Sequence, residues 1–175
     1  MTAEYHFITH WKIRGTVEEV AEVLDDAPSL ARWWPSVYLE VRMLELGDPV
    51  TRVGRVVDLY TKGWLPYTLR WRFTISESRG TQGFSLVADG DFVGTGVWTF
   101  RQNAEVAEVT YDWRIRADKP LLRYGSFVFR PIFKSNHLWA MARGEESLNL
   151  ELRRRRAATE EERVAIPPPP RPTFR

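Results

Sequence analysis

Residues 120–156, PLLRYGSFVFRPIFKSNHLWAMARGEESLNLELRRRR, decide the fold because they predict one long helix at the end of a strand-rich chain. Pro131 suits the first turn of a helix, where its fixed φ angle and missing N–H cost nothing. Apolar and small residues then recur at helical spacing and form one stripe: Phe129, Phe133, Ala140, Met141, Gly144, Leu148 and Leu152. At about 1.5 Å per residue, the segment after Pro131 runs roughly 38 Å, enough to cross a small domain.

The charged residues of this helix fit the same interpretation. Three glutamates are expected to lie mostly off the apolar stripe: Glu145, Glu146 and Glu151. The four arginines of 153–156 fall in the last turn, where positive charge complements the carboxyl end of the helix dipole. The helix is therefore amphipathic and should lay its stripe on the rest of the domain.

The chain before this helix predicts strands with two short helical segments after the first. Residues 5–13 alternate apolar and polar side chains, with Tyr5, Phe7, Thr9, Trp11 and Ile13 on one face. Thr16 and Glu19 form a capping box ahead of a helix over 17–25, and a helical turn over 29–33 stops at Pro35. Alternation and turn residues then predict six strands: 37–46, 53–62, 67–79, 83–90, 92–102 and 106–117.

The predicted order β-αα-β₆-α indicates an α+β fold. Consecutive strands with short links pair antiparallel, and a sheet of seven strands twists too strongly to lie flat. It is expected to curl around the one element long enough to fill its concave face, the C-terminal helix. Residues 1–156 are predicted to form this single domain.

The last residues, 157–175, show no apolar period and contain four consecutive prolines. Proline cannot continue a helix or join a central strand, so an unstructured tail is one interpretation. The other is a docking segment for a partner protein, because PPPPRP can adopt the extended polyproline conformation.

Composition excludes several classes of protein. There is no run of 18 apolar residues and no signal-peptide pattern at the start, which predicts a cytoplasmic protein without a membrane segment. With zero cysteines and three scattered histidines, neither a metal nor a cofactor is expected. The net charge is only +2 and the basic residues are spread along the chain, which argues against nucleic acid as a partner.

Four segments carry a resemblance to a known family: RWWPSV (32–37), GVWTF (96–100), VTYDWRI (109–115) and NHLWAMARGEESL (136–148). With the element order, they resemble the polyketide cyclase/dehydrase and lipid-transport branch of the START/Bet v 1-like (SRPBCC) superfamily, over about residues 4–156. The resemblance implies a helix-grip fold with a deep cavity between sheet and C-terminal helix. It also implies apolar or aromatic ligands such as lipids, sterols, polyketides or quinones, without selecting one activity.

Aromatic residues on one face of the strands are the candidate lining of that cavity. The predicted ligand-binding residues are Tyr67, Trp71, Trp98, Tyr111 and Trp113 from strands, with Phe133, His137 and Met141 from the helix. The alternative is an ordinary close-packed core. His137 could act as a general acid or base, or could simply donate to a backbone carbonyl. Asn136 or Arg143 turns inward instead if the helix phase differs by one residue.

Three further motifs have structural interpretations beside functional ones. Asp89-Gly90-Asp91 indicates a hairpin or bulge rather than a catalytic carboxylate pair. Gly94 and Gly96 indicate sheet curvature, and less a close approach of ligand to backbone. The Trp33-Trp34-Pro35 turn, near one mouth of the cavity by the resemblance, is either a hydrophobic plug or a gate.

Three functions from different classes follow. The first is a carrier or sensor that binds a small hydrophobic or aromatic molecule without changing it. The second is a polyketide-type cyclase or dehydratase with an acid or base such as His137 in the same cavity. The third is a protein-interaction module with a closed core. A cavity of several hundred Å³ would favour the first two.

Overall fold

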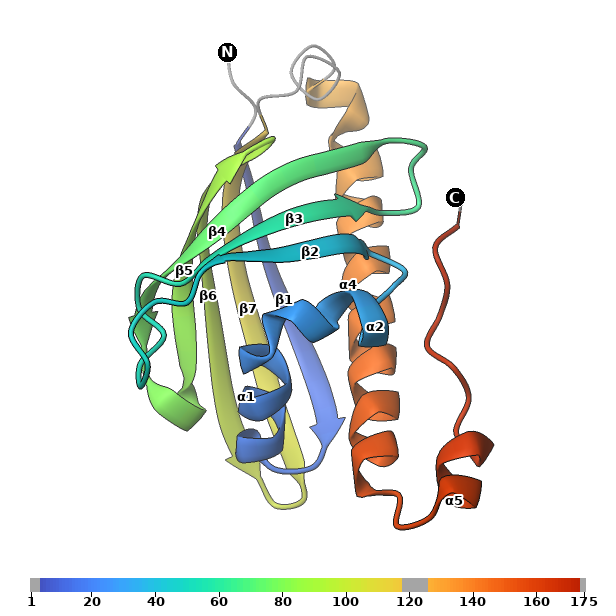
Figure 1. The fold of residues 1–175 in the computed structure, drawn as a ribbon. Coiled ribbons are helices and arrows are strands. Elements are labelled where there is room, and N and C mark those ends of the chain that lie inside the picture. Colours follow the sequence, from blue (N-terminus) through green and yellow to red (C-terminus); the bar gives the residue numbers. More distant parts are fainter. Residues whose placement is uncertain (1–3, 118–125, 174–175) are drawn as a thin grey trace.

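The computed structural model describes residues 4–117 and 126–173, and its described part contains one seven-stranded antiparallel sheet. The strands run in the spatial order β1-β7-β6-β5-β4-β3-β2. Their bounds are β1 (Glu4–Arg14), β2 (Tyr38–Glu45), β3 (Val56–Lys62), β4 (Thr68–Ser78), β5 (Gly83–Gly90), β6 (Phe92–Asn103) and β7 (Val106–Ala117). The sheet is strongly curved, and a long helix, α4, runs along its concave side (Figure 1). The predicted α+β architecture is confirmed.

Alternation of side chains decides which face of the sheet is buried. In β1, Trp11 and Ile13 are buried and Tyr5, Phe7 and Thr9 half-buried, while the alternate residues are exposed. All the pairings from β2 to β7 are sequential antiparallel hairpins, and β1 joins the far side of β7 along its whole length. At the Asp89–Asp91 motif, β5 ends at Gly90 and β6 starts at Phe92, which is the predicted hairpin.

Two short helices follow β1 and cover one end of the sheet (Figure 1). Helix α1 (Val17–Asp25) starts at the predicted capping box, with Glu19 N donating to Thr16 Oγ1 and Thr16 N to the Glu19 carboxylate. A 3₁₀ turn, η1 (Ala27–Ser29), leads into α2 (Leu30–Trp33), and a second one, η2 (Gly80–Gln82), joins β4 to β5. Trp33 ends α2 and Trp34 follows it, and both are buried.

Helix α4 (Ser126–Arg156) is longer than the sequence predicts. Pro131 is expected in its first turn, but the helix begins five residues earlier and Pro131 lies inside it. Its missing N–H leaves one backbone carbonyl without a helical partner, which is tolerable at a turn where Pro131 itself faces solvent. The predicted stripe faces the sheet, with Met141, Leu148 and Leu152 buried; the side chain of Phe129 lies outside the described residues.

Glu151 departs from the sequence prediction, because it is buried rather than off the stripe. Arg32 of α2 donates to both of its carboxylate oxygens, at 2.9 and 2.7 Å, and Arg155 donates at 3.0 Å. Burial alone would raise the pKa of Glu151, but these hydrogen bonds outweigh burial and lower it. An amphipathic pattern cannot reveal such a residue, since its partner Arg32 comes from α2, far away in the sequence.

Part of the segment predicted to be an unstructured tail is helical. Residues Glu160–Ala165 form α5, which starts at a second capping box between Thr159 and Glu162. The chain then turns back beside α4 (Figure 1), where Arg154 donates to the carbonyl of Pro167 at 2.8 Å. The capping box was a readable sequence feature that the proline run obscured.

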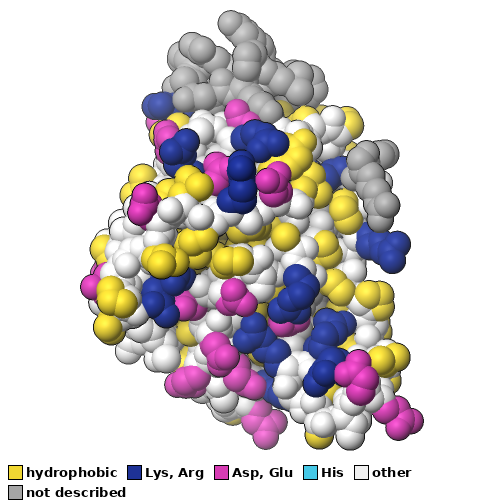
Figure 2. Space-filling model, viewed as in Figure 1, with side chains coloured by type: hydrophobic (Ala, Val, Ile, Leu, Met, Phe, Trp, Pro, Cys, Tyr) yellow, Lys and Arg dark blue, Asp and Glu magenta, His cyan; other side chains and the backbone are white. Residues whose placement is uncertain are grey.

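The surface seen in Figure 2 mixes the two signs of charge. Arginines and lysines lie beside aspartates and glutamates over most of this face, rather than in one basic patch. None of the described helices has both the length and the apolar character needed to cross a membrane.

Candidate functional site

An aromatic cavity lies between the sheet and the amino-terminal half of α4. Its volume is about 120 Å³. The walls come from β1, β3, β4, β7 and α4, with further residues from the α2–β2 turn and the start of β6. The strands supply the large rings because inward-facing positions recur every second residue, and the curl of the sheet brings these positions together.

Seven of the eight predicted residues lie around this cavity: Tyr67, Trp71, Tyr111, Trp113, Phe133, His137 and Met141. Trp98 does not line it. Its ring instead stacks on Tyr111, with ring centroids 4.0 Å apart, and so lies behind the cavity wall. The structure therefore brings the predicted set together with one exception; ligand binding by these residues stays a prediction.

Sequence reasoning missed several residues of the lining. Tyr5 and Phe7 line the cavity from β1, and the alternation that identified them as inward-facing was sufficient to include them. Trp34 lines the cavity from the α2–β2 turn, and Tyr38 lines it from the start of β2. Lys62 was not predicted to line it, because a lysine at the end of a strand ordinarily faces solvent. Asn136, which the sequence offered as an alternative to His137, lines the cavity together with His137.

The imidazole of His137 is held by an apolar neighbour and a hydroxyl. Phe7 stacks on it with ring centroids 4.2 Å apart, and Thr9 Oγ1 lies 3.3 Å from Nε2. Burial lowers the pKa of His137 to about 4, so the ring is neutral at neutral pH. A neutral imidazole without a carboxylate beside it has no proton to donate readily and is a weak base.

Other polar groups in the lining are mostly hydrogen-bond donors. Trp71 Nε1 donates to Thr61 Oγ1 at 3.0 Å, and Asn136 Oδ1 accepts from the backbone N–H of Leu65 at 3.2 Å. Burial raises the pKa of Tyr38, Tyr67 and Tyr111, so these phenols stay protonated. Within the described part of the chain, the Tyr5 hydroxyl and Trp34 Nε1 are buried without a hydrogen-bond partner. The lining thus offers donors to a ligand that carries an acceptor.

A row of aromatic rings in contact with one another bounds the cavity on the side of α1. Trp11 lies with its ring centroid 5.4 Å from those of both Trp34 and Trp98, and Trp98 in turn contacts Tyr111 and Phe84. We call Trp11, Trp34, Trp98 and Tyr111 the aromatic wall. Gly144 of α4 permits this packing, since a Cβ there would overlap Trp34 and lie 2.7 Å from Trp11 Cζ2.

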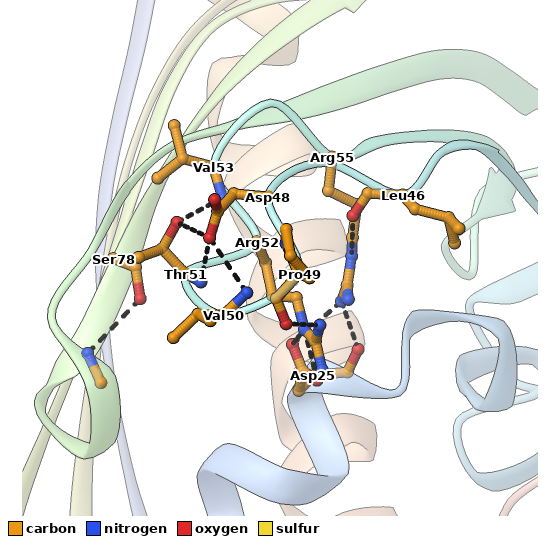
Figure 3. Close-up of polar contacts among 11 residues, drawn as sticks. Asp25, Leu46, Asp48, Pro49, Val50, Thr51, Arg52, Val53, Arg55 and Ser78 are labelled. Atoms are coloured by element: carbon orange, nitrogen blue, oxygen red, sulfur yellow. Dashed lines mark hydrogen bonds and ion pairs between the residues drawn. The ribbon is translucent and has the colours of Figure 1, made fainter.

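Beyond the aromatic wall, a second hollow of about 330 Å³ lies between α1 and the sheet. Phe73, Ile75, Phe84 and Phe100 line its sheet side. The 46–55 loop covers it and is fastened to Asp25 at the end of α1, as Figure 3 shows: Arg55 Nη1 donates to Asp25 Oδ1 at 2.9 Å and Arg52 Nε to Oδ2 at 3.2 Å. The fold therefore has two separate hollows on its concave face.

Over residues 4–117 and 126–173, no three histidine, aspartate or glutamate side chains gather where a metal ion could be shared. The candidate site is therefore the aromatic cavity, whose polar groups are mainly hydrogen-bond donors.

Comparisons with known proteins find the same fold at low sequence identity. No family model and no curated protein matches the chain. Among solved structures, the protein TTHA0849 from Thermus thermophilus is 17% identical with a TM-score of 0.66, covering 85% of this chain and 99% of that one. The Zhui aromatase/cyclase from Streptomyces sp. R1128 is 20% identical with a TM-score of 0.66, covering 89% and 97%.

A STAR-related lipid transfer protein from Xanthomonas axonopodis is 16% identical with a TM-score of 0.53, and the match covers 85% of each chain. At these identities the likeness concerns the fold. Its elements are those described above, a curled antiparallel sheet closed by a long C-terminal helix. The chain therefore shares with these structures the helix-grip fold that the sequence analysis predicted.

Proposed function

We propose that the protein binds a small, largely apolar aromatic molecule in the aromatic cavity, as a carrier or sensor. The observation that carries this proposal is the cavity of about 120 Å³ that Trp71, Tyr111, Trp113 and Phe133 line together. Solved structures of the same fold include an aromatase/cyclase and a lipid transfer protein, which supports hydrophobic ligands in general. The cavity is smaller than the several hundred Å³ named above as favouring ligand binding, but the core is not filled, so an interaction module with a closed core is the weaker proposal.

The volume limits the size of the ligand. About 120 Å³ is below the roughly 300–1,000 Å³ of common small-molecule pockets and close to an engineered cavity of about 150 Å³ that holds benzene. One aromatic ring therefore fits without rearrangement. A larger ligand has to displace side chains, and Tyr67 and Phe133, which meet edge to face with ring centroids 6.4 Å apart, are well placed to move.

The cyclase alternative receives less support from the geometry. Catalysis needs an acid or base near the ligand, and His137 is the candidate that the sequence analysis named for this role. Its pKa of about 4 makes it neutral and weakly basic at physiological pH. The donors of the cavity suit orientation of a ligand better than proton transfer.

Titration with toluene tests the proposal, with two helix variants as a matched pair. Ala140 lines the cavity and Ala142, two residues on, is exposed. Toluene should shift the indole N–H resonances of Trp71 and Trp113 in the native protein. Ala140→Phe places a ring in the space and should weaken binding at least about tenfold, whereas Ala142→Phe should leave it unchanged.

Two results would refute the binding proposal. One is the absence of saturable shifts with toluene and with larger neutral aromatics such as naphthalene. The other is undiminished binding by Ala140→Phe, which would place the bound molecule elsewhere, with the second hollow under α1 as the alternative location.

A further inference from the structure

The chain that follows α5, residues 166–173, is extended and belongs to no helix or strand. We call it the proline segment. Ile166 leaves α5 with φ −80° and ψ 126°, which is the region of the polyproline conformation. The prolines of 167–170 hold φ near about −65°, and every residue before a proline is restricted to extended ψ angles. Sterics therefore favour the polyproline conformation along the segment, with three residues in each turn.

Burial along the proline segment follows the same period of three. Residues three apart share one edge, and one edge is half-buried throughout: Ile166, Pro169 and Pro172. The residues of the two other edges are exposed, apart from the half-buried Pro170: Pro167, Pro168, Arg171 and Thr173. Near its start the segment is fastened to α4, where Arg154 donates to the carbonyl of Pro167 at 2.8 Å. One edge thus faces the body of the protein, and two edges are open.

The open edges carry two features that a proline-binding protein can recognise. Pro167 and Pro170 are three residues apart, so their rings lie on one edge and match the spacing at which aromatic-lined grooves bind prolines. Arg171 lies on the adjacent edge, is exposed, and has no ion-pair partner among the described residues. A free guanidinium at this place favours a groove with a carboxylate at one end.

We propose that the proline segment docks in a groove of a partner protein that is lined by aromatic side chains and carries a carboxylate for Arg171. The partner contacts the edge of Pro167 and Pro170 and the edge of Pro168 and Arg171. Because the prolines fix the conformation before binding, association loses little conformational entropy. A protein is favoured over a lipid surface, since residues 166–173 carry one charge and expose no aromatic or large aliphatic side chain. This role is independent of the aromatic cavity.

Isotope-labelled SH3 and WW domains, two kinds of module with aromatic-lined grooves for prolines, are suitable probes. The unlabelled full chain is the titrant, so its own eight tryptophans do not obscure the signals of the module. A synthetic peptide of residues 166–173 is the reference ligand. At least one module should show saturable shifts of its groove resonances with the full chain. The affinity should lie within about tenfold of that for the peptide, because the edges that the groove contacts are open.

Two double variants test which edge is recognised. Pro167→Ala with Pro170→Ala should weaken binding of the full chain roughly tenfold or more, since each substitution removes two ring carbons from the contact. Pro169→Ala with Pro172→Ala removes as many prolines at the same spacing, but from the edge that faces the body. It matches the loss of rigidity and should weaken binding by less than about threefold.

The charge of Arg171 is tested in the same titration. Arg171→Gln should weaken binding about threefold at low salt and less at high salt, because an exposed ion pair is screened. Arg163→Gln is the matched control: Arg163 is exposed on α5, outside the proline segment, and its loss changes the net charge equally. It should leave binding unchanged.

Three outcomes would refute the docking proposal. Binding of the peptide without binding of the full chain would show that the body masks the proline segment. Equal weakening by the two double variants would show that the open edges are not the ones recognised. Failure of both modules to bind either the full chain or the peptide would show that the segment is no polyproline ligand. None of these results bears on the aromatic cavity, whose binding is measured with toluene.

Discussion

At the scale of single residues, Glu151 shows how a charge far from the cavity holds two helices together. It is 1% exposed, and its carboxylate receives hydrogen bonds from Arg32 and Arg155. Arg32 belongs to α2 and Glu151 to α4, so the contact joins the cap of the sheet to the long helix. A buried carboxylate that loses its charge leaves both arginines without a full partner.

Glu151→Gln should therefore lower the free energy of unfolding by about 1–3 kcal/mol, measured by urea denaturation. Because the folded pKa is lowered, the contribution of Glu151 is complete above about pH 4.3, the ordinary value for glutamate, and is lost as the pH falls through the folded pKa. The stability difference between native protein and variant should shrink accordingly in acid.

Glu146→Gln is the matched control for that experiment. Glu146 is exposed on the same helix and pairs with Arg143 at 2.7 Å. Exposed pairs contribute little, so its loss should cost less than about 0.5 kcal/mol. Equal effects of the two changes would show that burial of Glu151 has no energetic consequence.

The buried His137 should give the stability of the protein a second dependence on pH. Its folded pKa of about 4 lies below the ordinary value of 6.5, so the unfolded chain takes up the proton first as the pH falls. Stability should decrease between about pH 6.5 and pH 4, by up to about 3 kcal/mol from this residue. Thermal unfolding of the native protein, compared with His137→Gln, should show the decrease only in the former. His10→Gln, at an exposed position on β1, should behave like the native protein.

At the scale of elements, the contact of α4 with the sheet depends on a glycine that helix propensity disfavours. Gly144 costs about 1 kcal/mol relative to alanine in a helix. Its missing side chain, however, leaves room for the rings of Trp34 and Trp11. The helix thus gives up intrinsic stability for close packing against the aromatic wall.

Gly144→Ala should destabilise the protein by about 1–3 kcal/mol, because overlap with two tryptophan rings outweighs the gain in propensity. Ala142→Gly, at an exposed position two residues away, isolates propensity and should cost about 1 kcal/mol. Both values come from chemical denaturation. A stabilising effect of Gly144→Ala would mean that the rings of Trp34 and Trp11 can shift at little energetic cost.

The same helix marks the limits of prediction from sequence. Its apolar stripe was predictable, since periodicity records which face is buried. Its start at Ser126 was not, because a proline is ordinarily read as a first-turn residue and only the finished fold shows that Pro131 is tolerated inside. Strand positions followed from alternation and turns, so most of the cavity lining could be predicted. Trp98 could not be placed correctly, because alternation gives the face of a residue but not its depth along the curled sheet.

At the scale of the whole molecule, the tail contributes little to stability. Helix α5 has no buried residues, and the contact of Arg154 with the carbonyl of Pro167 lies at the surface. Truncation after Arg156 should therefore change the free energy of unfolding by less than about 0.5 kcal/mol. A fall of several degrees in melting temperature after this truncation would instead show that α5 and the proline run dock firmly on the body.

The aromatic wall also gives the molecule an optical property. Stacked indole and phenol rings held at fixed angles, such as Trp98 on Tyr111 with ring centroids 4.0 Å apart and 17° between the planes, couple their electronic transitions. Such coupling produces a paired positive and negative band in the ultraviolet circular dichroism that helices and strands do not produce. The protein thus contains its own chromophore pair at the boundary between its two hollows. Any movement of that boundary should change the band pair while the backbone signal stays constant.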